Sequence, residues 1–380
     1  MPKAVYIHVP FCEQICHYCD FNKFFLQNQP VDEYIELCEM EIKNTISNFP
    51  TEEVSSVYVG GGTPTSLTTD QLGRLLEWVK EYFPLAENYE WSVEVNPGSA
   101  NFDKLQKMQE IGVNRLSIGA QTFDAALLKK IGRDHEPGDV EKTVQQAIEA
   151  GFTNLSIDLM MGLPEQTMEQ FQETLRQVVA LPIQHISAYS LKIEPKTVFY
   201  QLWSKGKLPM PGDELEADMY EELRNTLKEA GFTHYEISNF AKKGFESTHN
   251  LTYWNNEEYY GIGAGAHSYV QGVRRINHGP LPKYMNAVKQ SGFPYREEHQ
   301  VSKTEAMEEH MFMGLRKLDG VSYTNFYNRF GIEMRSIFSQ EIDRLVNDGL
   351  LRDNGSSIQL TDHGLLLGNE VFEKFLLKEQ

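Results

Sequence analysis

Short apolar runs alternate with amphipathic segments through the first half of this 380-residue chain. The runs are rich in β-branched and aromatic residues, as strands are, and the segments between them repeat apolar residues at helical spacing. Repeated strand–helix units require parallel strands with right-handed crossovers, so the sequence predicts an α/β fold, either a barrel of six such units or a doubly wound sheet. The expected strands cover 4–9, 54–59, 91–95, 115–118, 155–158 and 185–190, and the expected helices between them cover 32–49, 70–82, 102–111, 140–150 and 168–179.

Glycines and polar residues gather where these strands end. A glycine run at 60–62 follows the second strand, Glu94 lies near the end of the third, and Gln121 and Asp158 lie at the ends of the fourth and fifth. In both alternative folds the chemistry belongs at the C-terminal ends of parallel strands. We therefore expect these residues to share one site with the loop that follows the first strand.

That loop carries three of the four cysteines in a C-x3-C-x2-C pattern, formed by Cys12, Cys16 and Cys19. A [4Fe–4S] cluster ordinarily takes four thiolates, so three thiolates leave one iron open to a substrate or an exchangeable ligand. The spacing alone leaves two alternatives open. One is a zinc site that needs a further ligand such as His17, and the other is a chance group of buried thiols. Cys38 lies in an expected helix and is predicted to be a buried residue instead of a ligand.

Composition limits the class of protein. An apolar content of 41% indicates a globular chain, and a formal net charge of −19 disfavours binding to a nucleic-acid backbone. The sequence shows neither an apolar run long enough for a membrane span nor a leader, so we expect a cytoplasmic protein that is not an integral membrane protein. A reducing compartment also suits an iron–sulfur cluster and unpaired cysteines.

The strand–helix pattern loosens after residue 190. A segment with the sequence His-Asn-Leu-Thr-Tyr-Trp occupies 249–254, and from about 301 the chain changes to helices followed by a short β-hairpin. This pattern predicts a small C-terminal α+β domain of winged-helix type, whose acidic surroundings disfavour DNA. We expect a barrel domain over 1–235, a connecting segment over 236–300 and the C-terminal domain over 301–380.

The cysteine triad, the Gly-Gly-Gly-Thr-Pro run after the second strand and Glu94 after the third together resemble the radical S-adenosylmethionine superfamily. The resemblance implies a partial (β/α)6 barrel, related to the TIM barrel, with a [4Fe–4S] cluster on Cys12, Cys16 and Cys19. It also implies that the open iron binds the amino and carboxylate groups of S-adenosylmethionine. Glycines beside that ligand let the backbone approach it without an intervening side chain.

Within the superfamily, nearly the full length resembles the branch that holds oxygen-independent coproporphyrinogen oxidase (HemN) and the heme chaperones of the HemW type. Two sets of residues match positions that contact S-adenosylmethionine in this branch. In the first set, the resemblance places Tyr6 near the sulfonium and implies that the polar groups of S-adenosylmethionine are held by Gly61, Gly62, Thr63 and Glu94. The second set lines the nucleotide region, and in the oxidase some of its members contact a second S-adenosylmethionine. It consists of Tyr18, Gln121, Arg133 and Asp158. The permanently charged, forked guanidinium of Arg133 suits a carboxylate.

Two positions distinguish the two relatives. The oxidase has a fourth cysteine where this chain has Phe21, which argues against coproporphyrinogen dehydrogenase activity, and the segment from His249 to Trp254 matches the H-N-x-x-Y-W signature of the HemW type. The resemblance thus implies a chaperone that binds heme and transfers it to an apo-hemoprotein, such as a membrane or respiratory protein. The alternative is an oxidase that decarboxylates a tetrapyrrole, and a third reading is a cluster-bearing regulator whose winged part binds a partner.

A neutral imidazole is a good heme ligand, so His249 is a candidate ligand, and Tyr253 and Trp254 are candidates for stacking on the macrocycle. His267 is a second candidate ligand. On the residues alone an alternative stands beside this prediction: His249 and Asn250 hydrogen-bond a loop, while Tyr253 and Trp254 fill the seam beneath it.

Overall fold

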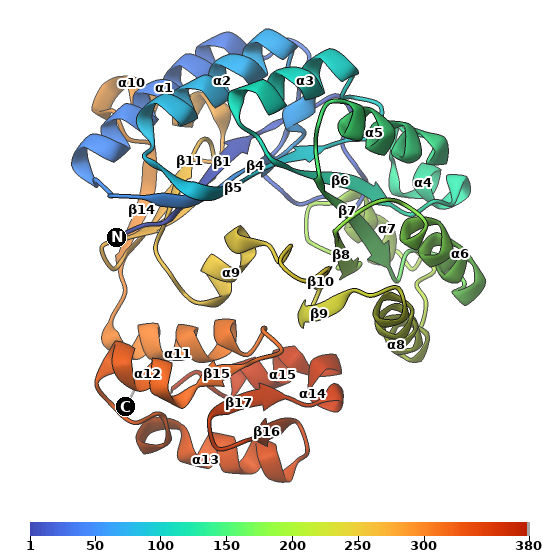
Figure 1. Ribbon diagram of the computed structural model, residues 1–380, viewed down its shortest axis with the longest axis vertical. Helices are drawn as coiled ribbons and strands as arrows, with labels where there is room; N and C mark the ends of the chain where they lie inside the picture. Colours follow the sequence, from blue (N-terminus) through green and yellow to red (C-terminus); the bar gives the residue numbers. More distant parts are fainter. Residues whose placement is uncertain (378–380) are drawn as a thin grey trace.

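A single twelve-stranded sheet organises the computed structural model, which describes residues 1–377 (Figure 1). Six strands of this sheet are parallel and lie side by side in chain order, as repeated strand–helix units require. They are β1 (Ala4–Val9), β4 (Val54–Gly61), β5 (Leu85–Val95), β6 (Arg115–Gln121), β7 (Asn154–Met161) and β8 (His185–Ser190). The two edge strands of the sheet do not pair with each other within the described residues. The barrel is therefore partial, which confirms the predicted fold class.

Helices cover the convex face of the sheet (Figure 1). Their ends follow local signals: Thr68 and Gln71 form a capping box at the start of α2, and Gly112 ends α3 with a φ of 131°. Each helix buries an apolar stripe against the strands. The helices are α1 (Val31–Asn48), α2 (Thr69–Tyr82), α3 (Phe102–Ile111), α4 (Ala125–Ile131), α5 (Pro137–Glu149), α6 (Met168–Val179) and α8 (Asp213–Glu229).

The sheet continues beyond the six units at both edges. Beside β1 lies a further parallel strand, β11 (Tyr259–Ile262), followed by three antiparallel strands; beside β8 lie two short antiparallel strands. The strands β11 to β14 were not predicted from the sequence, because each is short, interrupted by glycine or rich in charged residues. The added strands are β12 (His267–Val270), β13 (Val273–Asn277), β14 (Tyr295–Gln300), β9 (Thr233–Glu236) and β10 (Asn239–Ala241). The boundaries at 235 and 300 stay a prediction.

Three further helices and a small sheet complete this part of the fold. The helix α9 (Thr248–Trp254) lies on the concave side of the sheet, between the strands and the C-terminal domain (Figure 1). In the cysteine loop, β2 (Phe11–Cys12) pairs with β3 (Phe24–Phe25). The other two helices are α7 (Val198–Trp203), after β8, and α10 (Leu281–Ser291), which packs on α1.

The C-terminal domain has the predicted α+β character. Helices surround a three-stranded antiparallel sheet, in which the two strands of the expected hairpin pair with each other. One continuous apolar core joins this domain to the barrel. The elements are α11 (Lys303–Gly314), β15 (Val321–Ser322), α12 (Tyr323–Phe330), α13 (Met334–Asn347), β16 (Leu351–Asp353), β17 (Ser357–Leu360), α14 (Asp362–Leu366) and α15 (Gly368–Glu373). Over residues 1–377, none of the helices combines the length and the apolarity that crossing a membrane requires.

Candidate cofactor and ligand site

A cavity of about 350 Å³ opens at the C-terminal ends of the parallel strands. Its walls come from the cysteine loop, the glycine run after β4 and the ends of β5, β6 and β7. The sequence-predicted residues that line it are Cys12, Cys16, Tyr18, Cys19, Gly61, Gly62, Thr63, Glu94, Gln121, Arg133 and Asp158. Residues from six separate stretches of chain thus meet in one place, as the strand-end argument predicted. Tyr6 and His249 lie outside this lining.

The cysteine loop is docked on the C-terminal end of α4. The His17 backbone N–H donates to the carbonyl of Ile131 at 2.9 Å, and the His17 Nδ1 lies 2.9 Å from the carbonyl oxygen of Lys130. The Gln14 side chain donates to the carbonyl of Gly132 at 2.8 Å. The last turn of a helix leaves carbonyl groups without intrahelical partners, and this loop supplies donors to them. His17 thus acts as an anchor of the loop.

All three thiols of the loop are free and reach the cavity. The hydroxyl of Thr63 donates to the Cys12 sulfur at 3.6 Å, and Arg133 Nη1 donates to the Cys16 sulfur at 3.6 Å. Burial raises the pKa of the Cys12 thiol to about 11, and burial also raises the pKa of the Cys19 thiol. The metal-free thiols of Cys12 and Cys19 are therefore protonated at neutral pH, and metal binding must release their protons.

The donor set fits an iron–sulfur cluster better than a single ion. Within residues 1–377, no three His, Cys, Asp or Glu side chains are grouped closely enough to hold one metal ion, as a zinc site requires. A [4Fe–4S] cube carries its irons at separate corners and takes its thiolates at separate points. Three thiols spread along the wall of one cavity, with a cation and a hydroxyl beside two of them, match that requirement.

The glycine run lies too close to its neighbours to carry side chains. A Cβ at Gly60 would stand 2.7 Å from the carboxylate of Glu94, and one at Gly62 would stand 2.8 Å from the carbonyl oxygens of Phe11 and Val9. Gly61 has a φ of 111°, a conformation that glycine adopts without strain. The run therefore brings bare backbone against both the cysteine loop and Glu94.

Glu94 is a half-buried carboxylate held by two donors. The Gly61 N–H donates to Oε2 and the Tyr58 hydroxyl donates to Oε1, each at 3.0 Å. Burial, together with the nearby charge of Asp158, raises the pKa of Glu94 to about 7. Asp158 accepts from the Ser117 hydroxyl at 2.9 Å, and burial raises its pKa as well. Two partly desolvated carboxyl groups in one cavity favour a ligand that brings positive charge.

Other polar groups of the cavity lack partners. Arg133 Nη2 bonds the carbonyl of Gly119, but its buried Nε has no hydrogen-bond partner among the described residues, and neither has the buried Oδ1 of Asn96. Gln121 has a φ of 66°, an uncommon conformation for a residue other than glycine. Buried polar groups are normally satisfied, so these atoms indicate that a polar ligand completes the site.

The structure places Tyr6 and His249 below the rim of the cavity, which the C-terminal ends of the parallel strands form. The Tyr6 hydroxyl lies 2.9 Å from His8 Nδ1, and the His8 Nε2 lies 2.7 Å from the carbonyl oxygen of Asn22, at the end of the cysteine loop. His249 is only 1% exposed and lies at the start of α9. Its Nδ1 lies 3.1 Å from the Ser56 hydroxyl and its Nε2 lies 2.9 Å from the Tyr253 hydroxyl.

The neighbours of the His249 segment also point inward. Tyr253 meets Tyr259 edge to face, with ring centroids 4.6 Å apart, and the Trp254 ring lies 4.6 Å from the guanidinium of Arg316. These contacts match the alternative in which the segment fills a seam. Ligation of heme by His249 stays a prediction, and it would require the ring nitrogen that binds the iron to leave its present partner. The other candidate, His267, is exposed on β12.

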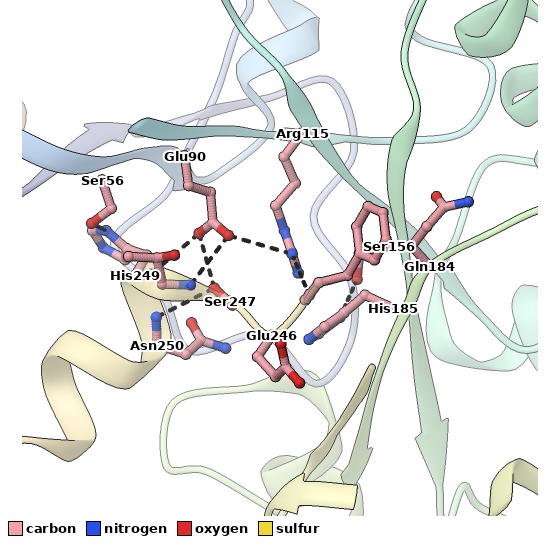
Figure 2. A network of polar contacts seen from close by, with 12 residues as sticks. Ser56, Glu90, Arg115, Ser156, Gln184, His185, Glu246, Ser247, His249 and Asn250 are labelled. Atoms are coloured by element: carbon pink, nitrogen blue, oxygen red, sulfur yellow. Dashed lines mark hydrogen bonds and ion pairs between the residues drawn. The ribbon is translucent and has the colours of Figure 1, made fainter. Parts of the chain in front are cut away.

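A polar network forms the floor of the barrel (Figure 2). The buried carboxylate of Glu90 accepts from the Ser247 hydroxyl at 3.2 Å and from the backbone N–H groups of Thr248 at 3.1 Å and His249 at 3.2 Å. Arg115 lies 3.5 Å from Glu90 and donates to the carbonyl of Phe245 at 3.2 Å. A carboxylate at the N-terminus of α9 is favourable because the first N–H groups of a helix have no partners within it.

Several residues of the cavity and its floor were not predicted. Tyr58 and Ser117 line the cavity, and Arg115 reaches it from below. Alternation along the strand signals Tyr58, because it lies two residues before Gly60 and so faces the same side. Glu90 lies four residues before Glu94 on β5 and so faces the same side as Glu94. Their partners in the His249 segment lie far away in sequence, and the sequence carries no local signal for those contacts.

Comparisons with known proteins agree with this geometry. The family model for the radical SAM superfamily matches residues 6–178, and that for the HemN C-terminal domain matches residues 301–367. The chain is 48% identical to the heme chaperone HemW of Bacillus subtilis, over 98% of this chain and 99% of that protein. It is 34% identical to the heme chaperone HemW of Escherichia coli, over 99% and 98%. Among solved structures, coproporphyrinogen III oxidase (HemN) from Escherichia coli, a radical SAM enzyme, superposes with a TM-score of 0.86 at 26% identity, over 98% and 90%.

Proposed function

The chain belongs to the radical SAM superfamily and, within it, to the HemW heme chaperone family, and from that premise we propose that it binds heme and transfers it to an acceptor protein. The observation that carries this proposal is the identity of 48% with a heme chaperone along essentially the whole of both chains. Similarity of that extent includes the barrel, the segment with α9 and the C-terminal domain together.

We propose that Cys12, Cys16 and Cys19 hold a [4Fe–4S] cluster whose fourth iron takes S-adenosylmethionine. When bound, that pair supplies one-electron chemistry. The cavity supports this proposal because its lining includes both free thiols and unpartnered polar atoms. Gly61, Gly62 and Thr63 would offer backbone and hydroxyl groups to the polar end of the ligand.

The remaining residues of the proposed site have separate tasks. The Glu94 carboxylate, fixed by two donors, would bind an ammonium group, and the buried guanidinium of Arg133 would bind a carboxylate or a ribose oxygen. Tyr18, Gln121 and Asp158 would line the nucleotide. Tyr6 lies beneath this region and contacts the Tyr58 ring, so it would act through that neighbour.

The second candidate function is decarboxylation of a porphyrinogen, because the whole fold superposes on the HemN oxidase. The position two residues after Cys19 speaks against it. Phe21 stands there, and its side chain is 62% exposed at the edge of the cavity, where it offers no thiol. We propose that binding of heme, and not oxidation of a porphyrinogen, is the activity of this chain.

The acceptor is proposed by chemical class only, as an apo-hemoprotein, with membrane-associated respiratory proteins among the candidates. We propose a cytoplasmic location, because free thiols and an iron–sulfur cluster require a reducing compartment.

One anaerobic experiment tests the proposal. Hemin is titrated into the cluster-loaded chain, and the loaded protein is mixed with apomyoglobin as a general heme acceptor. We expect a saturable heme absorption band and its transfer to apomyoglobin. A parallel incubation with coproporphyrinogen III and a reductant is expected to give no substrate-dependent 5′-deoxyadenosine. An absent heme band together with a decarboxylated product would favour the oxidase. Phe21→Cys is the matched variant, and it is expected to gain no oxidase activity.

A further inference from the structure

Two aromatic rings connect the helix α9 to the cavity. The ring of His249 stacks on the ring of Tyr58, with centroids 5.2 Å apart and planes 28° from parallel. The Tyr58 hydroxyl in turn donates a hydrogen bond to the Glu94 carboxylate at 3.0 Å. The contact thus runs from α9, through β4, to a carboxylate that the proposed function assigns to S-adenosylmethionine.

His249 is firmly held in a neutral form. Burial lowers the pKa of the imidazole to about 3, so the ring carries no charge at neutral pH. A neutral imidazole has one N–H donor and one acceptor nitrogen. The hydroxyls of Ser56 and Tyr253, at 3.1 Å and 2.9 Å, satisfy both, since each hydroxyl is able to donate or accept. The orientation of the ring over Tyr58 is fixed by these two contacts.

The helix that carries His249 is itself fixed at both ends. At its start, the Glu90 carboxylate accepts from the N–H groups of Thr248 and His249, and the Arg115 guanidinium lies beside it (Figure 2). At its end, residues of the C-terminal domain contact the helix. Arg329 donates to the carbonyl of Asn255 at 2.9 Å, and Arg316 lies over the Trp254 ring. Both domains therefore define where His249 lies.

We propose that His249 is a positioning residue for the S-adenosylmethionine end of the cavity, because it holds the Tyr58 hydroxyl against Glu94. The inference rests on the proposed function and deepens it. It gives the segment from His249 to Trp254 a role in joining the C-terminal domain to the binding site for the sulfonium cofactor. In this arrangement the imidazole is a buried bridge, and neither of its nitrogens is free for an iron.

The test measures two ligands on the same anaerobic, cluster-loaded preparations. Calorimetry gives the dissociation constant of S-adenosylmethionine, and an absorption titration gives the binding of hemin. Tyr58→Phe removes one hydrogen bond to a charged group and keeps the ring, so we expect S-adenosylmethionine to bind about tenfold more weakly. His249→Ala is expected to weaken it by a similar factor, because the hydroxyl of Tyr58 loses its support.

Two further variants make the result specific. His249→Gln keeps a donor and an acceptor within reach of Tyr253 but has no imidazole, and we expect it to recover part of the lost affinity for S-adenosylmethionine. The double variant with Tyr58→Phe is expected to bind no more weakly than the weaker single variant, because both changes remove the same contact. Tyr89→Phe removes a hydroxyl that bonds Gly112 outside the cavity, and it is the matched control with unchanged affinity.

The outcomes separate the positioning role from heme ligation. The inference is supported if hemin binding stays unchanged in every His249 variant while S-adenosylmethionine binding weakens. It is overturned if His249→Gln and His249→Ala lose the heme absorption band and keep the affinity for S-adenosylmethionine. Failure of the unaltered chain to bind S-adenosylmethionine would overturn both this inference and the proposed cofactor site. Failure of the unaltered chain to bind hemin would overturn only the proposed chaperone function. Iron content and the urea midpoint of each variant report on folding.

Discussion

Glu90 and Glu94 lie four residues apart on β5, and alternation along the strand directs both side chains to the concave face. They nevertheless have different surroundings. Glu90 accepts from three groups of the segment that starts α9 and pairs with Arg115. Glu94 faces the cavity with Tyr58 and Gly61 as donors, and its pKa is raised to about 7. The same residue type thus stabilises the fold at one level of the barrel and is available to a ligand at the next.

The neighbours of each carboxylate follow the same division. On the floor, both ring nitrogens of His185 lie within 2.9 Å of hydroxyls, and both ring nitrogens of His249 lie within 3.1 Å of hydroxyls. At the rim, Arg133 Nε and Asn96 Oδ1 have no partner among the described residues. The two imidazoles of the floor thus have partners at both nitrogens, whereas two polar atoms of the cavity lining are left for a ligand.

The largest effect is expected at the cysteine loop. Cys16→Ala removes one of three proposed ligands, and we expect reconstituted protein to lose its cluster, seen as loss of iron, sulfide and the visible absorption band. Cys38→Ala is the control. Its buried thiol contacts the Tyr284 hydroxyl and lies away from the loop, so this variant is expected to keep its iron. Full iron content in the Cys16 variant would contradict the assignment.

A large loss of stability is expected on the floor. Glu90→Gln leaves the Arg115 charge buried without its counter-ion, and removing one partner of a buried pair costs about 3–5 kcal/mol of unfolding free energy. Urea unfolding followed by circular dichroism measures the loss. Glu87→Gln makes the same change at an exposed position of β5 and is expected to stay within about 0.5 kcal/mol of the unaltered chain. Equal midpoints for the two variants would show that Glu90 has no special role.

A pH effect on cofactor binding is expected at the rim. The proposed ammonium partner needs Glu94 ionised, and this carboxyl has a pKa of about 7. As pH falls through 7 the group must lose a proton on binding, so affinity for S-adenosylmethionine is expected to be about tenfold weaker at pH 6 than at pH 8. Calorimetry at both values measures it. In Glu94→Gln this dependence is expected to disappear, and its persistence there would assign the titration to another group.

The smallest effect is expected where the C-terminal domain meets α9. Arg329→Ala removes hydrogen bonds to the carbonyls of Asn255 and Asn256 from an exposed side chain, so we expect a loss of about 1 kcal/mol in urea unfolding. Arg352→Ala removes an exposed contact with Gln359 and is the control, expected within about 0.5 kcal/mol. A larger loss in the control would contradict the importance of this end of α9.

The sequence was sufficient for the rim and much of the barrel. Strands such as 4–9 and 185–190 are rich in β-branched or aromatic residues, and helix 102–111 ends at a glycine, so local chemistry defines them. The cavity residues follow from one geometric rule, because parallel strands bring their C-terminal ends to the same edge.

The floor was beyond sequence reasoning. The pairing of β11 with β1 joins residues about 250 positions apart, and the bond from the His249 N–H to Glu90 spans 159 positions. No local pattern reports such contacts. His249 shows the consequence: as a motif residue it is a candidate iron ligand, whereas its surroundings make it a buried bridge between Ser56 and Tyr253.

The most direct test compares the two glutamates of β5 in one measurement. S-adenosylmethionine is titrated by calorimetry into cluster-loaded Glu90→Gln and Glu94→Gln at pH 8, under conditions in which both variants are folded. The pKa of Glu94 is raised from about 4.5 to about 7, so its neutral form contributes stability that is fully present below about pH 4.5 and is lost as the pH rises to about 7. Glu94→Gln is therefore expected to be no less stable than the unaltered chain at pH 8. We expect Glu94→Gln to bind at least about tenfold more weakly. Glu90→Gln, although less stable, is expected to keep most of its affinity, because the amide oxygen of Gln still accepts from the N–H groups that fix the start of α9. Weak binding by Glu90→Gln with unchanged binding by Glu94→Gln would contradict the division between rim and floor.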